Sequence, residues 1–94
     1  MKSIIQKDKY CYVCMSRDNL HLHHIFYGTA NRKISDKNGF TCWLCGYHHN
    51  LGGKNCVHEN KELDLKLKKQ CQKEFEETHS REEFISLIGK NYLD

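Results

Sequence analysis

Metal-binding side chains dominate this short sequence. Thirteen of its 94 residues are Cys or His, and five of the six cysteines and six of the seven histidines lie between residues 11 and 58. Only 21 residues are Leu, Ile, Val or Phe, which leaves a thin apolar core for one domain of this length. So small a fold needs a second source of stability, and the two usual sources are disulfides and bound metal.

The sequence has no membrane-targeting feature. No stretch approaches the ~18 apolar residues of a membrane span, and the N-terminal MKSIIQKDKY lacks the apolar core of a signal peptide. We therefore expect no membrane association and a reducing, cytoplasmic location, where thiols bind metal more often than they form disulfides. Residues 1–58 carry eight Lys/Arg against three Asp, and residues 59–94 carry seven against nine acidic residues. The positive, Cys/His-rich part suits a polyanionic partner.

The residue pattern predicts a small α+β fold in a single domain, residues 1–94. Residues 20–26 and 40–44 have the alternating or aromatic and β-branched character of strands, and residues 45–51 begin a short helix. The polar segment 28–39 is framed by glycines and is predicted to be a functional loop.

Residues 59–94 are predicted to form an extension of two helices. The first helix spans about residues 59–78, and its buried stripe repeats every four residues at Leu63, Leu67, Cys71 and Phe75. Cys71 is therefore expected to be a core residue and not a metal ligand. The sequence SREE at residues 80–83 predicts a capping box that opens the second helix, and Gly89 is expected to end it.

Two ligand pairs with two intervening residues predict a structural Zn²⁺ site. Cys11 and Cys14 form the first pair, since ligands three residues apart on a tight turn can reach one tetrahedral ion. The second pair is either Cys42 and Cys45, or Cys45 and His48. We favour the pair with His48, because it straddles the turn from the second strand into the helix, as treble-clef knuckles do. Bound zinc would add on the order of 10 kcal/mol of apparent folding free energy.

Five histidines remain in this part of the chain: His21, His23, His24, His49 and His58. A His pair on a strand, a His at the start of a helix and another after a glycine turn occur in the order that a ββα-metal site requires. In such a site a hairpin and a helix hold a divalent ion against a phosphate. The remaining histidines therefore point to chemistry beyond structural zinc.

Residues 10–60 resemble the HNH endonuclease family. The resemblance rests on Leu22-His23-His24-Ile25, an Asn-bearing loop and Leu44-Cys45-Gly46-Tyr47-His48-His49. The layout, with a leading CxxC and the segment HHIFYGTANRKIS, is similar to small HNH-type proteins of bacteriophages and prophages of Gram-positive bacteria. It implies a treble-clef or ββα-metal core at residues 10–58, a helical extension at 59–94, and metal-dependent hydrolysis of phosphodiester bonds in DNA, with RNA left open.

The resemblance also implies roles for individual histidines. His23 and His49 would bind the catalytic ion with His58 as third ligand, and His24 would be the general base. Many HNH proteins carry an acidic residue beside the His pair, where this chain has His21 and Leu22. An all-nitrogen site favours Zn²⁺, Ni²⁺ or Mn²⁺ over Mg²⁺.

The His pair raises a question of strand geometry. Strict alternation would place His23 and His24 on opposite faces, so the implied roles need a bulge or a strand end there. A regular strand with one of the two buried in the core would contradict them.

The segment between the strands supplies the remaining site residues. The motif's Asn orients the general base or ties down the loop, and we assign this role to Asn31, because Asn38-Gly39 already suits a turn. Four basic residues flank the proposed site and are expected to hold phosphates: Arg32, Lys33, Lys37 and Lys54.

Two other functions fit the same sequence. The chain could be a catalytically degenerate HNH-like zinc module that binds nucleic acid or a protein. It could also be a structural or regulatory phage protein that recruits a phage or host partner through the amphipathic helices of residues 59–94.

Overall fold

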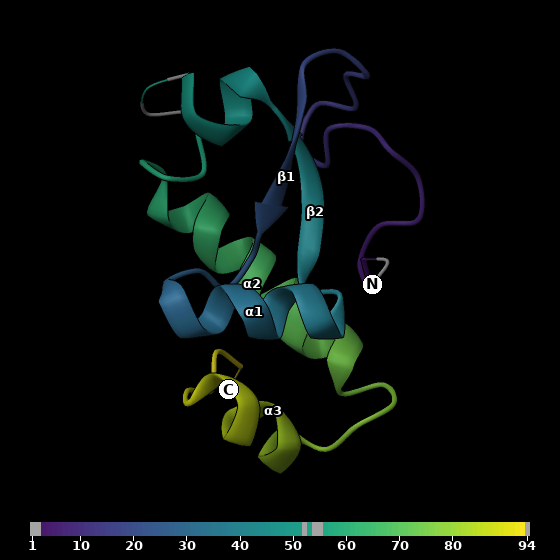
Figure 1. The fold of residues 1–94 in the computed structure, drawn as a ribbon, viewed down its shortest axis with the longest axis vertical. Coiled ribbons are helices and arrows are strands. Elements are labelled where there is room, and N and C mark those ends of the chain that lie inside the picture. The colour runs from purple at the N-terminus through teal and green to yellow at the C-terminus, as the bar shows by residue number, and fades with distance from the viewer. Residues whose placement is uncertain (1–2, 52, 54–55, 94) are drawn as a thin grey trace.

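The structure, a computed structural model, describes residues 3–51, 53 and 56–93. The elements follow in the order β1 (Leu20–His24), α1 (Thr29–Asn38), β2 (Thr41–Cys45), η1 (Tyr47–Leu51), α2 (Lys61–Phe75) and α3 (Arg81–Ile88) (Figure 1). η1 is a single π-helical turn. The small α+β class is confirmed, while the treble-clef and ββα-metal descriptions stay predictions. In the part of the chain that is described, no helix is long and apolar enough to cross a membrane.

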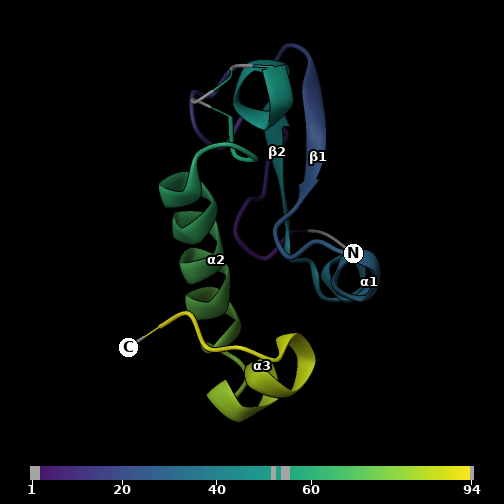
Figure 2. The same ribbon diagram turned by 90° about the vertical axis from the view of Figure 1, so that its left-hand side faces the viewer.

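β1 and β2 form a two-stranded antiparallel sheet. Leu20 pairs with Cys45 and His24 with Thr41, with every residue between them in regular register. Figures 1 and 2 place η1 at the end of the sheet farthest from α3, and α1 at the opposite end. One end of the sheet therefore lies beside the Cys/His-rich turn η1, and the other end lies beside the helix α1.

The segment predicted as a loop is the helix α1, so that prediction was wrong. Gly28 precedes the helix and Gly39 ends it in the left-handed conformation with φ 75°, where its N–H donates to the carbonyl oxygen of Ser35. The two glycines frame a helix instead of a loop, since glycine is the preferred residue just past a helix end. The buried Ser35 hydroxyl donates to the Phe26 carbonyl at 2.6 Å, which holds α1 against the chain that leaves β1.

The two C-terminal helices were predicted correctly. Asn60 caps α2 by accepting from the N–H of Leu63, and Ser80 and Glu83 form the expected capping box of α3, which Gly89 ends. Cys71 is fully buried in the core, and its burial raises the pKa of the thiol. It is a packing residue, as the periodicity indicated.

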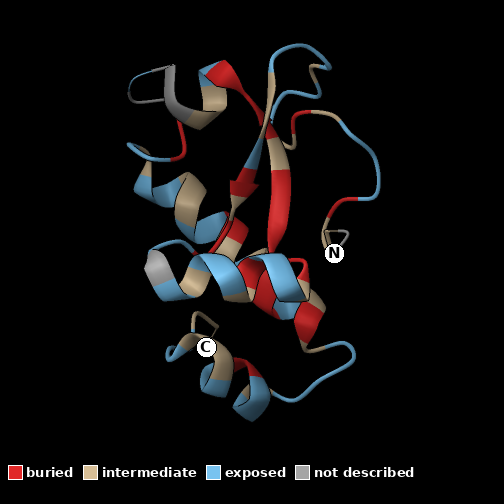
Figure 3. Cartoon of the chain, viewed as in Figure 1, coloured by how far each residue is buried: buried red, intermediate tan, exposed pale blue. Residues whose placement is uncertain are grey.

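An aromatic cluster joins the sheet end to the helices. Phe26 and Phe40 contact each other edge-on with ring centroids 5.4 Å apart, Phe40 meets Phe75 of α2 at 5.5 Å, and Phe26 meets Phe84 of α3 at 5.5 Å. β2 is almost wholly buried, whereas the visible sides of α1 and α3 are largely exposed (Figure 3). Apolar packing thus holds the helical end, and the same core cluster continues to the far end of the sheet through Cys11, Cys45 and Val57.

Two candidate metal centres

Cys11, Cys14, Cys45 and His48 form a cluster whose spacing suits a tetrahedral metal ion. One ligand atom from each lies within 4.8 Å of the others. The Sγ atoms of Cys14 and Cys45 are 3.7 Å apart, and His48 Nδ1 is 3.3 Å from Cys45 Sγ and 3.8 Å from Cys11 Sγ. Around zinc, Zn–S and Zn–N bonds of about 2.3 and 2.0 Å separate two sulfurs by about 3.8 Å and sulfur from nitrogen by about 3.5 Å. The cluster could therefore hold a metal such as zinc.

Local backbone structure aims the first ligand pair at the cluster. The N–H of Met15 donates to the Cys11 carbonyl at 2.8 Å, with Met15 in the left-handed conformation at φ 66°. Burial raises the pKa of Cys11, but hydrogen bonds from the N–H groups of Cys14, Cys45 and Val13 outweigh it and lower the pKa to about 6. The turn thus stabilises a thiolate, which is the form that binds metal.

Cys42 lies apart from this cluster. It is fully buried on β2 opposite His23, and burial raises the pKa of its thiol to about 12. A protonated thiol in the apolar core is a packing residue. Of the two tetrads that the spacing allowed, the structure assembles the one that contains His48.

His23, His49 and His58 form a second cluster, from β1, η1 and the segment before α2. One nitrogen from each lies within 4.8 Å of the others, and the Nε2 atoms of His49 and His58 are 3.3 Å apart. Metal–nitrogen bonds of about 2.1 Å separate two ligand nitrogens by about 3.0 Å at a right angle and about 3.4 Å in a tetrahedron. Three imidazoles at this spacing could share one divalent ion.

The environment of His23 fits metal ligation. Only 2% of the residue is exposed, and its Nε2 is buried without a hydrogen-bond partner. Burial, followed by the nearby His49 and His58, lowers the pKa of His23 to about 3, so the ring is neutral. Buried polar atoms nearly always have a partner, and a metal ion held with His49 and His58 would be that partner.

His21 contacts the second cluster through His49. Its Nδ1 is 2.9 Å from Nδ1 of His49, with the two rings edge-on. One of the two nitrogens donates and the other accepts. If His49 Nδ1–H is the donor, His49 Nε2 is left with a free lone pair facing His58. Such a hydrogen bond fixes the tautomer of a metal-binding histidine.

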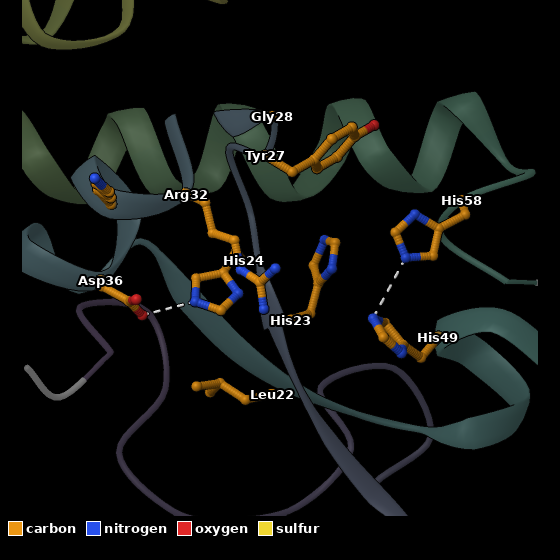
Figure 4. A pocket seen from close by; sticks show the side chains of 10 residues that line it. Leu22, His23, His24, Tyr27, Gly28, Arg32, Asp36, His49 and His58 are labelled. Atoms are coloured by element: carbon orange, nitrogen blue, oxygen red, sulfur yellow. Dashed lines mark hydrogen bonds and ion pairs between the residues drawn. The ribbon is translucent and has the colours of Figure 1, made fainter. Parts of the chain in front are cut away.

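His24 lies beside the second cluster and is paired with an acidic residue. Its Nε2 is 2.6 Å from the carboxylate Oδ1 of Asp36 on α1 (Figure 4). The side chain of His24 is 14% exposed and that of Asp36 is 62% exposed, so the pair opens to solvent on the Asp36 side. Sequence reasoning missed Asp36, because the segment that carries it was read as a loop.

A pocket of about 770 Å³ joins the histidines to α1. We call it the histidine pocket, and it is lined by Leu22, His23, His24, Tyr27, Gly28, Arg32, Lys33, Asp36, His49 and His58. Arg32 and Lys33 thus reach the proposed site, while Asn31 and Lys37, also on α1, do not line it. Lys54 lies outside the described residues.

The His pair lies at a strand end. β1 is regular and ends at His24. His23 is buried, but among the rings of His49, His58 and Tyr27 and not in the apolar core. Both members of the pair line the histidine pocket. β1 is thus a regular strand with one of its two histidines buried, against neighbouring rings, and the roles of His23 and His24 stay predictions.

Comparison with known proteins adds no assignment: no protein-family model, curated protein or solved structure matches the chain. What the fold and the two clusters define is a small α+β protein with Cys/His sites that could bind metal.

Proposed function

We propose that the chain is a metal-dependent endonuclease of the HNH type that hydrolyses phosphodiester bonds in DNA. One observation carries the proposal: a His–carboxylate pair, a three-His cluster and two cationic side chains line one pocket. A phosphodiester needs a base for the attacking water, a cation for the transition-state charge and positive groups to hold it. The histidine pocket contains a candidate for each.

His24 is the general base in this proposal. A proton on its Nε2 is held by Asp36 Oδ1 at 2.6 Å, which leaves Nδ1 as the nitrogen that accepts a proton from water. The carboxylate also stabilises the imidazolium that results, as a neighbouring opposite charge does. Asp36 is thus a positioning residue and takes the orienting role that the sequence resemblance gave to Asn31.

His23, His49 and His58 are the proposed metal ligands. A divalent ion held there would neutralise phosphate charge and stabilise the leaving 3′-oxygen. Arg32 and Lys33 bind the non-bridging phosphate oxygens, because their cationic side chains line the same pocket. The nitrogen-only ligand set favours Zn²⁺, Ni²⁺ or Mn²⁺ over Mg²⁺.

Plasmid nicking tests the proposal. The full chain is incubated with supercoiled plasmid in the presence of Mg²⁺, Mn²⁺, Ni²⁺ or Zn²⁺, together with His24→Ala, Asp36→Asn and the control His79→Ala. His79 is exposed and stacks on Phe75 outside the histidine pocket. We expect His24→Ala to abolish nicking, Asp36→Asn to slow it about tenfold through the lost charge, which corresponds to ~1.4 kcal/mol, and His79→Ala to nick normally. Nicking that survives His24→Ala unchanged would refute the assignment.

The alternative is an HNH-like module without catalysis. It is favoured by the absence of any carboxylate among the three grouped ligands His23, His49 and His58. In that case no metal supports nicking, while the chain still binds DNA or a protein partner. The phage origin, the cytoplasmic location and a partner for α2 and α3 stay predictions.

A further inference from the structure

A second concavity adjoins the histidine pocket and shares a wall with it. Tyr27 and His58 line both, with ring centroids 5.9 Å apart. The second concavity has a volume of about 430 Å³. We call it the lysine pocket, and its other lining residues are Val57, Lys61, Asp64, Leu65, Lys68, Lys90 and Tyr92.

The lysine pocket is positively charged and partly organised. Three lysines face one carboxylate, so its net charge is positive. The ammonium of Lys68 is 2.8 Å from Asp64 Oδ2 and lies over the ring of Tyr27 at 4.7 Å and that of Tyr92 at 5.7 Å. Burial lowers the pKa of Lys68, but the hydrogen bond and charge of Asp64 outweigh it and raise the pKa, which keeps the cation charged. Contacts on several sides fix this ammonium before any ligand binds.

The other two lysines are free to meet a ligand. Lys61 and Lys90 are exposed, and the Lys90 ammonium lies 5.2 Å from the centre of the Tyr92 ring. Exposed ammonium groups around an open cavity suit a phosphate.

We propose that the lysine pocket binds a backbone phosphate of the DNA strand, adjacent to the phosphodiester held in the histidine pocket. The inference rests on the proposed function for its substrate. In Figure 4, Arg32 and His58 lie on either side of His23, so the lysine pocket continues the site on the side away from Arg32. A strand that crosses the histidines then meets cations at both ends: Arg32 and Lys33 at one, Lys61, Lys68 and Lys90 at the other. The lysine pocket is thus a sequence-independent phosphate subsite.

The test is the salt dependence of DNA binding by the full chain. Binding of a fluorescent DNA duplex is followed by anisotropy in a His24→Ala background, which keeps every lysine and prevents cutting. The test variant combines Lys61→Gln with Lys90→Gln. The matched control combines Lys69→Gln with Lys73→Gln, which removes the same charge from a different pocket on α2.

The two variants should differ in slope. Each lost phosphate contact lowers the slope of log affinity against log salt by about 0.9. The lysine pocket holds one phosphate, so the test variant should lose about 3.5-fold less affinity than its parent between ~50 and ~200 mM salt, and the control should follow the parent. Equal slopes in the two variants, or a parent that binds no DNA, would overturn the subsite. If the slopes differ as expected but the chain with His24 intact nicks no plasmid, the subsite stands and the nuclease proposal fails. If nicking occurs and the slopes are equal, the nuclease proposal stands and the subsite fails.

Discussion

Replacing Cys45 with alanine should abolish folding, whereas the same replacement at Cys42 should only weaken it. Both thiols lie on β2 and both are buried, at 7% and 0% exposure. Cys45 belongs to the four-ligand cluster, and structural zinc contributes about 10–16 kcal/mol in apparent terms. A chain of this length has a total stability of only about 5–14 kcal/mol. Loss of a zinc ion bound there would therefore remove as much free energy as the whole fold possesses.

Cys42 serves as the matched control. Truncating its side chain leaves a small cavity in the apolar core, which costs about 1–2 kcal/mol and lowers the melting temperature by about 4–16 °C. The assays are zinc content by mass spectrometry after gel filtration and thermal unfolding by circular dichroism. Cys42→Ala should keep one tightly bound zinc per chain, and Cys45→Ala should keep none and show no cooperative transition. A Cys42→Ala chain that loses zinc while Cys45→Ala retains it would refute the ligand assignment.

Two further predictions concern the histidines. His21→Ala should weaken Zn²⁺ binding by the candidate cluster of His23, His49 and His58 about 10- to 100-fold. His21→Asn, whose side-chain oxygen can accept from His49 Nδ1–H, should restore most of the affinity. Isothermal titration with Zn²⁺ measures both variants, and equal affinities would contradict the positioning role of His21. The pKa of His23 is about 3 in the fold against an ordinary 6.5, so on acidification the unfolded chain takes up a proton that the folded chain refuses, and stability is lost as the pH falls below about 6.5. Between about pH 7 and pH 5.5 the free energy of unfolding should fall by ~1 kcal/mol because of His23. Urea unfolding measures this fall, which should be present in the unaltered chain and absent in His23→Gln. Parallel pH profiles of the two proteins would show that His23 is not buried as described.

The members of the Cys cluster were predictable from local spacing in the sequence. The pair Cys11 and Cys14 needs only a tight turn, and the choice of His48 over Cys42 followed from where β2 ends. Cys42 lies within β2, where its side chain points to one face of the sheet. Cys45 is the last residue of β2 and lies next to the turn that carries His48. The burial of Cys71 was equally predictable, since its four-residue spacing with Leu67 and Phe75 places all three residues on one helix face.

The partner of His24 could not be read in the same way. It required α1 to be recognised as a helix, because only a helix puts Arg32 and Asp36, four residues apart, on one face. Asn31 precedes Arg32 by one residue and so points about 100° away around the helix. Framing glycines are typical of loops, although a glycine after a polar segment is also the usual helix end. The sequence therefore favoured an asparagine beside His24, whereas the structure places the carboxylate of Asp36 there.

The two clusters are physically linked through η1. His48 contributes to the Cys cluster and His49 to the histidine cluster, since adjacent residues of a helical turn point in different directions. The backbone of His48 is also tied to the segment before α2, whose Val57 N–H donates to the His48 carbonyl at 2.7 Å, one residue before His58. A metal bound by Cys11, Cys14, Cys45 and His48 would therefore fix the turn that carries His49 and, through Val57, the segment that carries His58. Linkage makes such coupling reciprocal, so a metal bound by His23, His49 and His58 would in turn favour the turn that carries His48. Loss of metal at either cluster is therefore expected to weaken metal binding at the other.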